Sequence, residues 1–173
     1  PMEFFMRART FAIAGLALAA SSTLAFADPV AHPAITFAPE LHAELQENYG
    51  EREARVLSGY VDRALQRELT RAGIQNRGIQ IETTIIDARP NRPTFQQLID
   101  RPGLDSMGSV SIGGAELSAV LRGADGQALG EVRHRYYESD IRNVMSGSTW
   151  HDAQRAIGVF ARKVAREYQR IAQ

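Results

Sequence analysis

Residues 115–136, AELSAVLRGADGQALGEVRHRY, form the stretch that decides the fold. Apolar and polar residues alternate on both sides of Asp125-Gly126, a dipeptide that is typical of the tight turn of a β-hairpin. We predict a two-residue loop centred on Asp125-Gly126, which requires facing residues to have numbers that sum to 251. The apolar face then contains the pairs Ala115–Tyr136, Leu117–His134, Ala119–Val132 and Leu121–Gly130, and the other face contains Glu116–Arg135, Ser118–Arg133 and Val120–Glu131. This register is self-consistent because it separates apolar from charged side chains and sets opposite charges across from each other.

Two long amphipathic helices flank this hairpin in the sequence. A leucine or valine recurs every fourth residue from Leu57 to Leu69, which predicts a helix over about 51–72. Thr149 and Asp152 resemble a capping box, in which Asp152 replaces the usual Glu or Gln. The apolar residues that follow at spacings of three and four predict a second helix that extends to the C-terminus.

The remaining segments predict further strands and turns. Residues 79–86 alternate and are rich in β-branched side chains, which indicates a strand. Residues 35–37 predict a short edge strand, and a looser helical turn is expected at 40–48. Thr94 is the expected cap of a short helical turn over 95–99.

These elements predict the order (β)-α-β-β-β-α. Both apolar helix stripes need to be buried, and the simplest arrangement lays the two helices on one face of the sheet. We therefore predict the α+β class, as a two-layer sandwich with a mainly antiparallel sheet of three to four strands. Residues 28–50 are expected to form an extended entry segment, and residues 51–173 a single α+β domain.

The N-terminal segment, residues 1–27, has the three-part layout of a secretory signal peptide. A positive lead begins at Met6, an uncharged apolar run covers 11–24, and small residues precede the end of the segment at Ala27. The apolar run is shorter than the ~20 residues that a membrane-spanning helix needs. We predict cleavage after Ala27, with residues 1–5 upstream of the true start, and a periplasmic or secreted product. An uncleaved N-terminal anchor is the alternative.

Composition and charge exclude several classes of function. The chain has 20 basic and 20 acidic residues, so no overall charge favours nucleic acid or an anionic membrane as a partner. The chain has no cysteine, which excludes a lipid-modified cysteine, a thiolate metal site and a cysteine nucleophile. Gly113-Gly114 lacks the spacing of a nucleotide-binding loop and precedes a strand, so the sequence predicts no cofactor.

Short motifs mark the hairpin and the two helix starts. They are the glycine-glycine-alanine strand within 111–116, the Asp125-Gly126 turn, the threonine-tryptophan helix start at 149–153 and the Tyr-Gly-Glu-Arg-Glu helix entry at 49–53. In these motifs the chain resembles small exported proteobacterial proteins and lipoproteins of unknown function. The resemblance implies an α+β fold and an exported location, and it carries over no catalytic residue. The chain departs from the lipoprotein members because its leader has no cysteine to be acylated.

One candidate binding surface is the face of the hairpin that points away from the predicted helices. It carries Ser118, Arg133, Arg135 and Tyr137. Arginine and tyrosine are enriched among the residues that anchor protein interfaces. The alternative is a face that is merely hydrated, as is common for an uncovered antiparallel sheet.

A second candidate surface is the basic side of the C-terminal helix. It carries Arg155, Arg162, Lys163, Arg166 and Arg170. These residues suit an anionic lipid surface or an acidic partner. The interpretation that we favour is a solvated helix face whose cations also suit the negative end of the helix dipole.

The histidines and serines do not form a recognisable reactive site. His32, His42, His134 and His151 lack the short, regular spacing of zinc ligands, so no metal site is predicted. His134 is expected at the margin of the core, on the face of Val132. No serine has a base at a local spacing that would activate it, so no catalytic residue is assigned.

The sequence therefore predicts an exported, non-catalytic protein of the periplasm or cell envelope. Its expected partner is an envelope protein or a small ligand, as an accessory to a larger assembly. One alternative is a small periplasmic hydrolase with Asp, Ser and His residues assembled in space, although turn formation explains Asp87, Asp100 and Asp105 more simply. Another alternative is peripheral binding of anionic lipid through the C-terminal helix.

Overall fold

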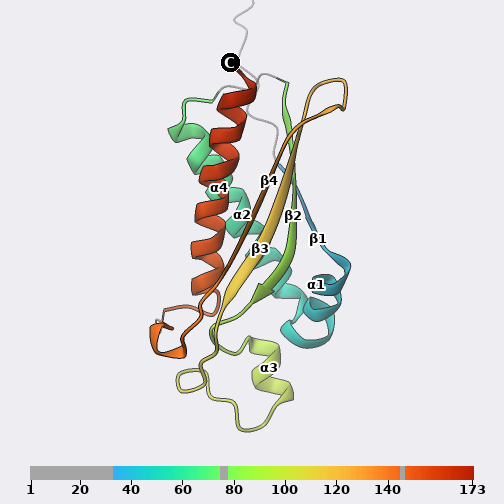
Figure 1. Cartoon of the computed structure of the whole chain (residues 1–173). Helices are drawn as coiled ribbons and strands as arrows, with labels where there is room; N and C mark the ends of the chain where they lie inside the picture. Colours follow the sequence, from blue (N-terminus) through green and yellow to red (C-terminus); the bar gives the residue numbers. More distant parts are fainter. Residues whose placement is uncertain (1–32, 75–77, 145–146) are drawn as a thin grey trace, which may run out of the picture.

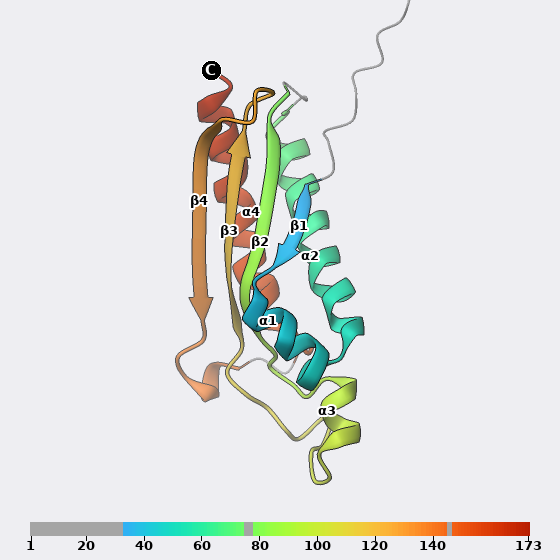
Figure 2. The same ribbon diagram turned by 90° about the vertical axis from the view of Figure 1, so that its right-hand side faces the viewer.

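A computed structural model of the chain describes residues 33–74, 78–144 and 147–173 (Figure 1). The predicted signal peptide and His32 lie outside these residues. The described elements form two layers, a four-stranded sheet and two long helices that cover one of its faces (Figure 1; Figure 2). Along the chain they are β1 (Ala34–Phe37), α1 (Pro39–Glu44), the π-helical turn η1 (Leu45–Tyr49), α2 (Glu51–Arg71), β2 (Gln80–Arg89), α3 (Phe95–Asp100), β3 (Gly114–Arg122), β4 (Ala128–Tyr137), the 3₁₀ turn η2 (Ile141–Asn143) and α4 (His151–Ile171).

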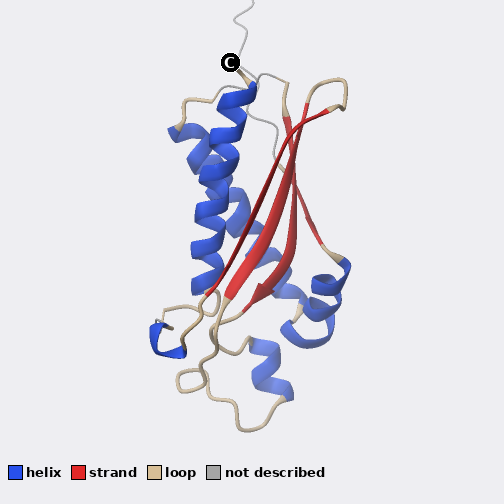
Figure 3. Ribbon diagram, in the orientation of Figure 1, coloured by secondary structure: helices blue, strands red, loops and turns tan. Residues whose placement is uncertain are grey.

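The sheet has the strand order β1-β2-β3-β4 (Figure 2). Figure 3 shows the strands as one layer beside the long helices. β1 runs parallel to β2, and the other two neighbouring pairs of described strands are antiparallel. α2 and α4 pack against each other, and α4 contacts β3 and β4. The predicted α+β class, with a mainly antiparallel sheet and two helices on one face, is confirmed. Within the predicted entry segment, the described residues form β1, α1 and η1.

The β3–β4 hairpin has the predicted register, with a different loop. The seven predicted pairs from Ala115–Tyr136 to Leu121–Gly130 all occur. The prediction of a two-residue loop is wrong, because the loop has three residues, 124–126. Gly126 adopts a φ of 80°, which glycine allows without strain. Leu129 is an extra residue on β4 that faces no β3 residue, and this bulge restores the predicted pairing.

The predicted helices occur close to their expected positions. α2 and α4 contain the two apolar stripes, and α3 follows Thr94 as a helix of six residues. The Thr94 side chain accepts the N–H of Gln97, and the Gln97 side chain accepts the N–H of Thr94, which confirms the predicted cap. Of the helices in the described ranges, none combines the length and the apolar character needed to span a bilayer.

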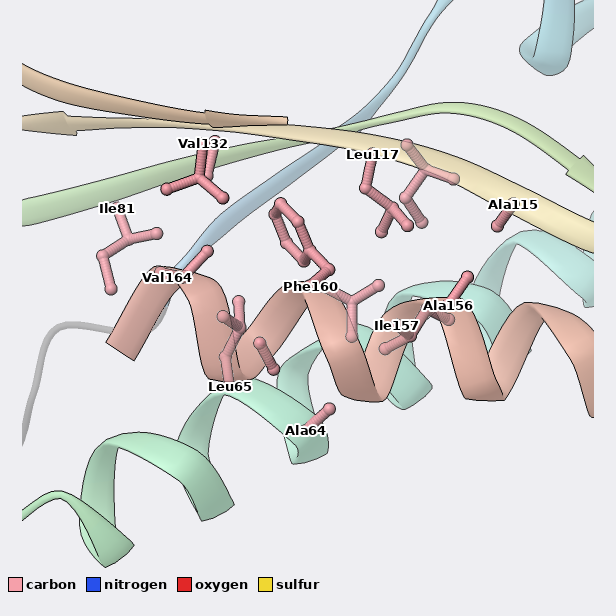
Figure 4. Close-up of a cluster of buried hydrophobic side chains, with 14 of the residues drawn as sticks. Ala64, Leu65, Ile81, Ala115, Leu117, Val132, Ala156, Ile157, Phe160 and Val164 are labelled. Atoms are coloured by element: carbon pink, nitrogen blue, oxygen red, sulfur yellow. The ribbon is translucent and has the colours of Figure 1, made fainter. Parts of the chain in front are cut away.

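The hydrophobic core lies between the sheet and the two long helices (Figure 4). Leu65 of α2, Leu117 of β3 and Phe160 of α4 are all completely buried there. Burial of one such side chain contributes about 1.5–3 kcal/mol, which stabilises the amphipathic helices that would otherwise be exposed to water. Burial in this core explains why apolar residues recur about every fourth position in the helices and every second position in the strands.

Asn91, in the loop after β2, caps the N-terminus of α4. Its Oδ1 accepts the main-chain N–H of Asp152 at 2.8 Å, and its Nδ2 donates to the Asp152 carboxylate at 2.5 Å. The predicted capping box of Thr149 and Asp152 is wrong, because Trp150 directly precedes the first helical residue and no local side chain makes the cap bond. The carboxylate of Asp152 is engaged by Asn91, so it does not bind back to the chain before the helix.

Candidate functional site

A cavity of about 330 Å³ lies at the end of the sheet where β2 ends and the chain returns to β3. Its polar lining consists of Tyr49, Arg89, Arg92, Gln97, Arg101, Ser109 and Ser111. Its apolar lining consists of Pro90, Pro93, Leu104, Val110 and Ile112. Three lining residues are arginines and none is acidic, so the cavity combines positive charge with apolar walls.

The segment between β2 and β3 builds most of this cavity. Pro90 and Pro93 end β2, because proline cannot donate to a sheet ladder or continue a helix. The Thr94 cap then starts α3, which contacts η1 and so brings Tyr49 to the same cavity. Asp105 accepts the N–H groups of the two residues that close the following turn. The local turn chemistry therefore positions residues that are far apart in the sequence.

The side chains of Arg92 and Arg101 differ in burial and in the hydrogen bonds that hold them. Arg92 is 9% exposed, and its Nη1 donates to the main-chain carbonyls of Ser106 at 3.0 Å and Met107 at 2.6 Å. Arg101 is exposed and donates to Asn48 Oδ1 at 3.4 Å, a long hydrogen bond. Arg92 is thus a fixed positive charge in the wall, whereas the guanidinium of Arg101 retains donors for an incoming anion.

Tyr49 supplies an aromatic part of the wall. Its ring meets that of Trp150 edge to face, with centroids 5.7 Å apart and planes at 82°. Burial, with smaller contributions from Glu44 and Asp87, raises the pKa of the Tyr49 hydroxyl, so this group stays protonated at neutral pH. Within the described part of the chain this hydroxyl has no hydrogen-bond partner, which leaves it able to donate to a ligand.

Asn91 joins the cavity wall to the core. Its main-chain N–H donates to the carbonyl of Thr149 at 2.7 Å, and its carbonyl accepts the N–H of Ser111 at 2.9 Å. A Cβ at position 113 would overlap the Asn91 side chain, so Gly113 leaves the space that this side chain fills. The main chain and the side chain of one buried residue, Asn91, therefore hold the loops beside the cavity and the start of α4 together.

The predicted open-face residues lie together on the uncovered side of the sheet. Ser118, Arg133, Arg135 and Tyr137 all belong to the β3–β4 face opposite the helices. Arg133 Nη2 lies 2.5 Å from the Glu116 carboxylate, and Arg135 Nε lies 3.9 Å from it. One carboxylate is thus shared by two guanidinium groups, and the exposed carboxylate of Glu131 lies on the same face of β4.

Tyr137 connects the open face with the cavity. Its hydroxyl donates to the Asp87 carboxylate at 2.6 Å, and the guanidinium groups of Arg89 and Arg135 lie over its ring at 5.0 and 5.3 Å. Burial and the hydrogen bond to Asp87 raise the pKa of the Tyr137 hydroxyl far above its ordinary value. Because Arg89 also lines the cavity, the predicted surface and the cavity are continuous.

The predicted basic residues of α4 lie on its exposed side, away from the cavity. They are Arg155, Arg162, Lys163, Arg166 and Arg170. The guanidinium of Arg155 lies over the Tyr136 ring at 5.0 Å, and Arg170 pairs with Glu167. A groove of about 400 Å³ separates the later part of this helix face from β4. The α4 residues therefore form a second surface, which the fold does not bring to the cavity.

The described histidines do not form the pairs that a hydrolase needs. His134 lies on the inward face of β4, as predicted, with its Nδ1 3.2 Å from Lys163 Nζ. Burial, with Lys163 and Arg162 adding to it, lowers the pKa of His134. In the described ranges, neither His134 nor His151 has a hydroxyl or carboxylate within hydrogen-bond distance. The hydrolase alternative gains no support from this geometry and stays a prediction.

The three aspartates near the proline-rich loop also remain apart. Asp87 accepts the hydroxyl of Tyr137, Asp100 accepts Gln96 Nε2 at 2.7 Å, and Asp105 closes its own turn. The turn role expected for these aspartates is confirmed for Asp105, whereas it is wrong for Asp87, which lies within β2. No pair of these carboxylates is placed for acid–base chemistry.

Sequence reasoning missed the cavity and its arginines. The stretch from Arg89 to Pro93 follows the predicted strand, and Arg101-Pro102 follows the predicted short helical turn, so the sequence pattern explains these residues as the ends of elements. A signal was present, since three arginines each directly precede a proline and no acidic residue occurs between 88 and 99. The participation of Tyr49 could not be found locally, because it depends on the packing of α3 on η1.

The resemblance of the sequence motifs to small exported proteins stays a prediction. The cavity and its arginines are the structural basis for a proposal about function. Comparison of the chain with protein-family models, with curated proteins and with solved structures gives no match.

Proposed function

We propose that the chain is an exported, non-catalytic binding protein that holds an anionic group of its ligand or partner in the cavity at the end of the sheet. The observation that supports this most directly is that Arg89, Arg92 and Arg101 line one cavity that has no acidic residue in its wall. A guanidinium forms paired, charge-assisted hydrogen bonds with a carboxylate or phosphate. The anionic group then lies against Arg101, within the field of Arg92. The charge of Arg89 is partly balanced by Asp87, whose carboxylate lies 3.3 Å from Arg89 Nε.

The rest of the lining favours a ligand that also has an apolar part. Val110 and Ile112 are 44% and 39% exposed, although both are aliphatic. Small-molecule sites generally have volumes of about 300–1,000 Å³, apolar walls and a few polar groups that orient the ligand. The cavity of about 330 Å³ lies at the lower end of this range, which suits a small ligand or the end of a peptide chain.

The exported location is supported by the sequence. The layout of residues 1–27 is that of a signal peptide, and cleavage after Ala27 places the product in the periplasm or outside the cell. In that compartment the partner is an envelope protein or a small anionic ligand. Binding without catalysis agrees with a site whose lining has three arginines, of which Arg92 is fixed in the wall, and no paired nucleophile and base.

Isothermal titration calorimetry with hexanoate, acetate and inorganic phosphate tests the proposal. Arg101→Ala is expected to weaken binding about tenfold or more, because a hydrogen bond to a charged group contributes ~1.5–3 kcal/mol. Arg142→Ala is the matched control, since Arg142 is an exposed arginine that pairs with Asp140 and does not line the cavity. Saturable binding to none of these anions, or equal affinity of Arg101→Ala and the unchanged chain, contradicts the proposal.

A further inference from the structure

β4 is an edge strand, and its outer side has no neighbouring strand among the described residues. The strand order places β4 at one end of the sheet, with β3 on its other side. Figure 2 shows β4 at the margin of the sheet, with α4 behind it. An edge strand presents unpaired main-chain groups to which an extended chain can bind.

The hydrogen-bond pattern of the hairpin determines which main-chain groups point outward. The N–H of Glu138 donates to the carbonyl of Gly113 at 3.0 Å, so this pair is hydrogen-bonded. Bonded and non-bonded pairs alternate along an antiparallel ladder. The even-numbered β4 residues from Gly130 onward therefore bond to β3. The N–H and C=O groups of Glu131, Arg133 and Arg135 point away from β3. These residues form a row of free donors and acceptors.

Basic side chains flank this row on the open face of the sheet. The side chains of Arg133 and Arg135 are 64% and 69% exposed, and both share the carboxylate of Glu116. The exposed side chain of Glu131 lies on the same face, so the carboxylates of Glu116 and Glu131 balance the two guanidinium groups there. An incoming chain therefore meets two exposed guanidinium groups and one exposed carboxylate on this side, and the excess of positive charge at the edge comes from α4.

Basic side chains flank the row on the helix side as well. The groove of about 400 Å³ between β4 and α4 is lined there by Lys163, Arg166, Glu167 and Arg170. Glu167 is neutralised by its ion pair with Arg170, which also holds the pKa of Glu167 below its ordinary value. Arg166 has no ion pair within the described part of the chain. The two surfaces predicted from the sequence thus lie on the two sides of one free strand edge.

We propose that the edge of β4 binds an extended acidic segment of a partner protein, which adds to the sheet as a further strand. The outward N–H and C=O groups of Glu131, Arg133 and Arg135 bind its main chain. Its acidic side chains, which alternate between the two faces of the sheet, contact Arg133 and Arg135 on one face and Lys163 and Arg166 on the other. This site goes beyond the proposed function, because it uses none of the residues that line the cavity.

Charge argues against a second copy of the chain as the occupant. A twofold-symmetric pairing of two β4 strands brings the same helix face of both copies together. Lys163 and Arg166 would then lie near their own counterparts, and like charges at an interface are destabilising. An acidic chain avoids this repulsion on the helix face and meets one like charge, that of Glu131, on the open face.

Nuclear magnetic resonance with two synthetic peptides, Ac-VEEEEV-NH2 and Ac-VKKKKV-NH2, whose four charged residues point to both faces of an added strand, tests the proposal. The acidic peptide is expected to slow the hydrogen exchange of the Glu131, Arg133 and Arg135 amides, and its affinity is expected to fall as salt is added. The lysine peptide is expected to leave these amides unprotected. Equal protection by the two peptides, or protection by neither, overturns the proposal.

Two variants separate the main-chain contribution from the charge contribution. Arg133→Pro removes an outward N–H that β3 does not use, and it is expected to weaken binding of the acidic peptide about tenfold or more. Arg133→Ala keeps the N–H, so it is expected to cause a smaller loss and a weaker dependence on salt. Arg142→Ala, away from the edge, is expected to bind as the unchanged chain does. Unchanged binding by a folded Arg133→Pro variant overturns the proposal.

A charge reversal on α4 provides a test that leaves the sheet intact. The double variant Lys163→Glu with Arg166→Glu is expected to lose the acidic peptide and to bind the lysine peptide. Retention of the acidic peptide by this variant overturns the proposal. Light scattering of the free chain provides the last check, because a dimer whose β4 amides are already protected places a second copy at the edge and also overturns it.

Discussion

Asn91 and Asp152 bind each other through two reciprocal hydrogen bonds, although 61 residues separate them in the sequence. Both residues are buried, with exposed fractions of 0% and 1%. The same Asn91 supports the loop that returns to β3, through the N–H of Ser111. This pair therefore connects the wall of the cavity with the first turn of α4.

Removal of this pair is expected to destabilise the fold strongly. Asn91→Ala leaves the buried Asp152 carboxylate without its main donor and is expected to lower the free energy of unfolding by about 2–4 kcal/mol. Thr149→Ala is the matched control, because Thr149 does not make the cap bond that the sequence pattern suggests, and a loss below about 1 kcal/mol is expected. Urea unfolding followed by circular dichroism measures both. A larger loss for Thr149→Ala than for Asn91→Ala would mean that the local capping box operates after all.

Two glycine substitutions are expected to have opposite effects on stability. Gly113→Ala places a methyl group against the side chain of Asn91 and is expected to cost about 1–3 kcal/mol, as overpacking does in a core. Gly158→Ala adds a methyl group inside α4 with only an ordinary contact to Arg162, and it is expected to stabilise by about 0.5–1 kcal/mol. Thermal unfolding of the two variants is the measurement. Stabilisation by Gly113→Ala is incompatible with the described packing of Asn91.

The lowered pKa of His134 predicts a dependence of stability on pH. Burial first, and then Lys163 and Arg162 of α4, disfavour the charged imidazole in the folded chain. The unfolded chain therefore binds more protons, and the free energy of unfolding decreases as the pH falls below about 6.5. The decrease ends once the pH is below the pKa of the folded state. His134→Gln is expected to flatten this part of the profile, and an unchanged profile would contradict the described burial of His134.

The predicted leader has a direct test by mass spectrometry. When the chain is expressed with residues 6–173 in a bacterium that has a periplasm, the exported product is expected to begin at Asp28. Ala27→Arg removes the small residue at the cleavage position and is expected to leave the leader attached. A product that keeps residues 6–27 in the unchanged chain, or that stays in the cytoplasm, contradicts the predicted location.

The parts of the fold that the sequence predicted depend on local periodicity. The hairpin register followed from alternation on both sides of Asp125-Gly126, and the stripe from Leu57 to Leu69 gave α2. The loop length was wrong because the same dipeptide occurs in two- and three-residue loops. The bulge at Leu129 compensates for the extra loop residue, so the register was correct although the loop was not.

The candidate site depends on contacts between distant segments, and these leave little trace in a local pattern. Arg92 and Arg101 appear in the sequence as residues beside turn-forming prolines, and Tyr49 as part of a helix entry. They share a cavity because α3 packs on η1 and because Asn91 fixes the intervening loops. The periodicity of apolar residues predicts which face of a helix or strand is buried. It does not predict which loops come together in the folded chain.

The most direct test of the binding site is to map an anionic ligand onto the ¹⁵N-labelled chain. Titration with hexanoate is expected to shift the side-chain Nε–H signals of Arg89, Arg92 and Arg101, together with the amides of Ser109 and Ser111. The signals of Arg162 and Arg166 on α4 are expected to stay in place. Shifts confined to α4, or no saturable shift in the cavity, would contradict the account.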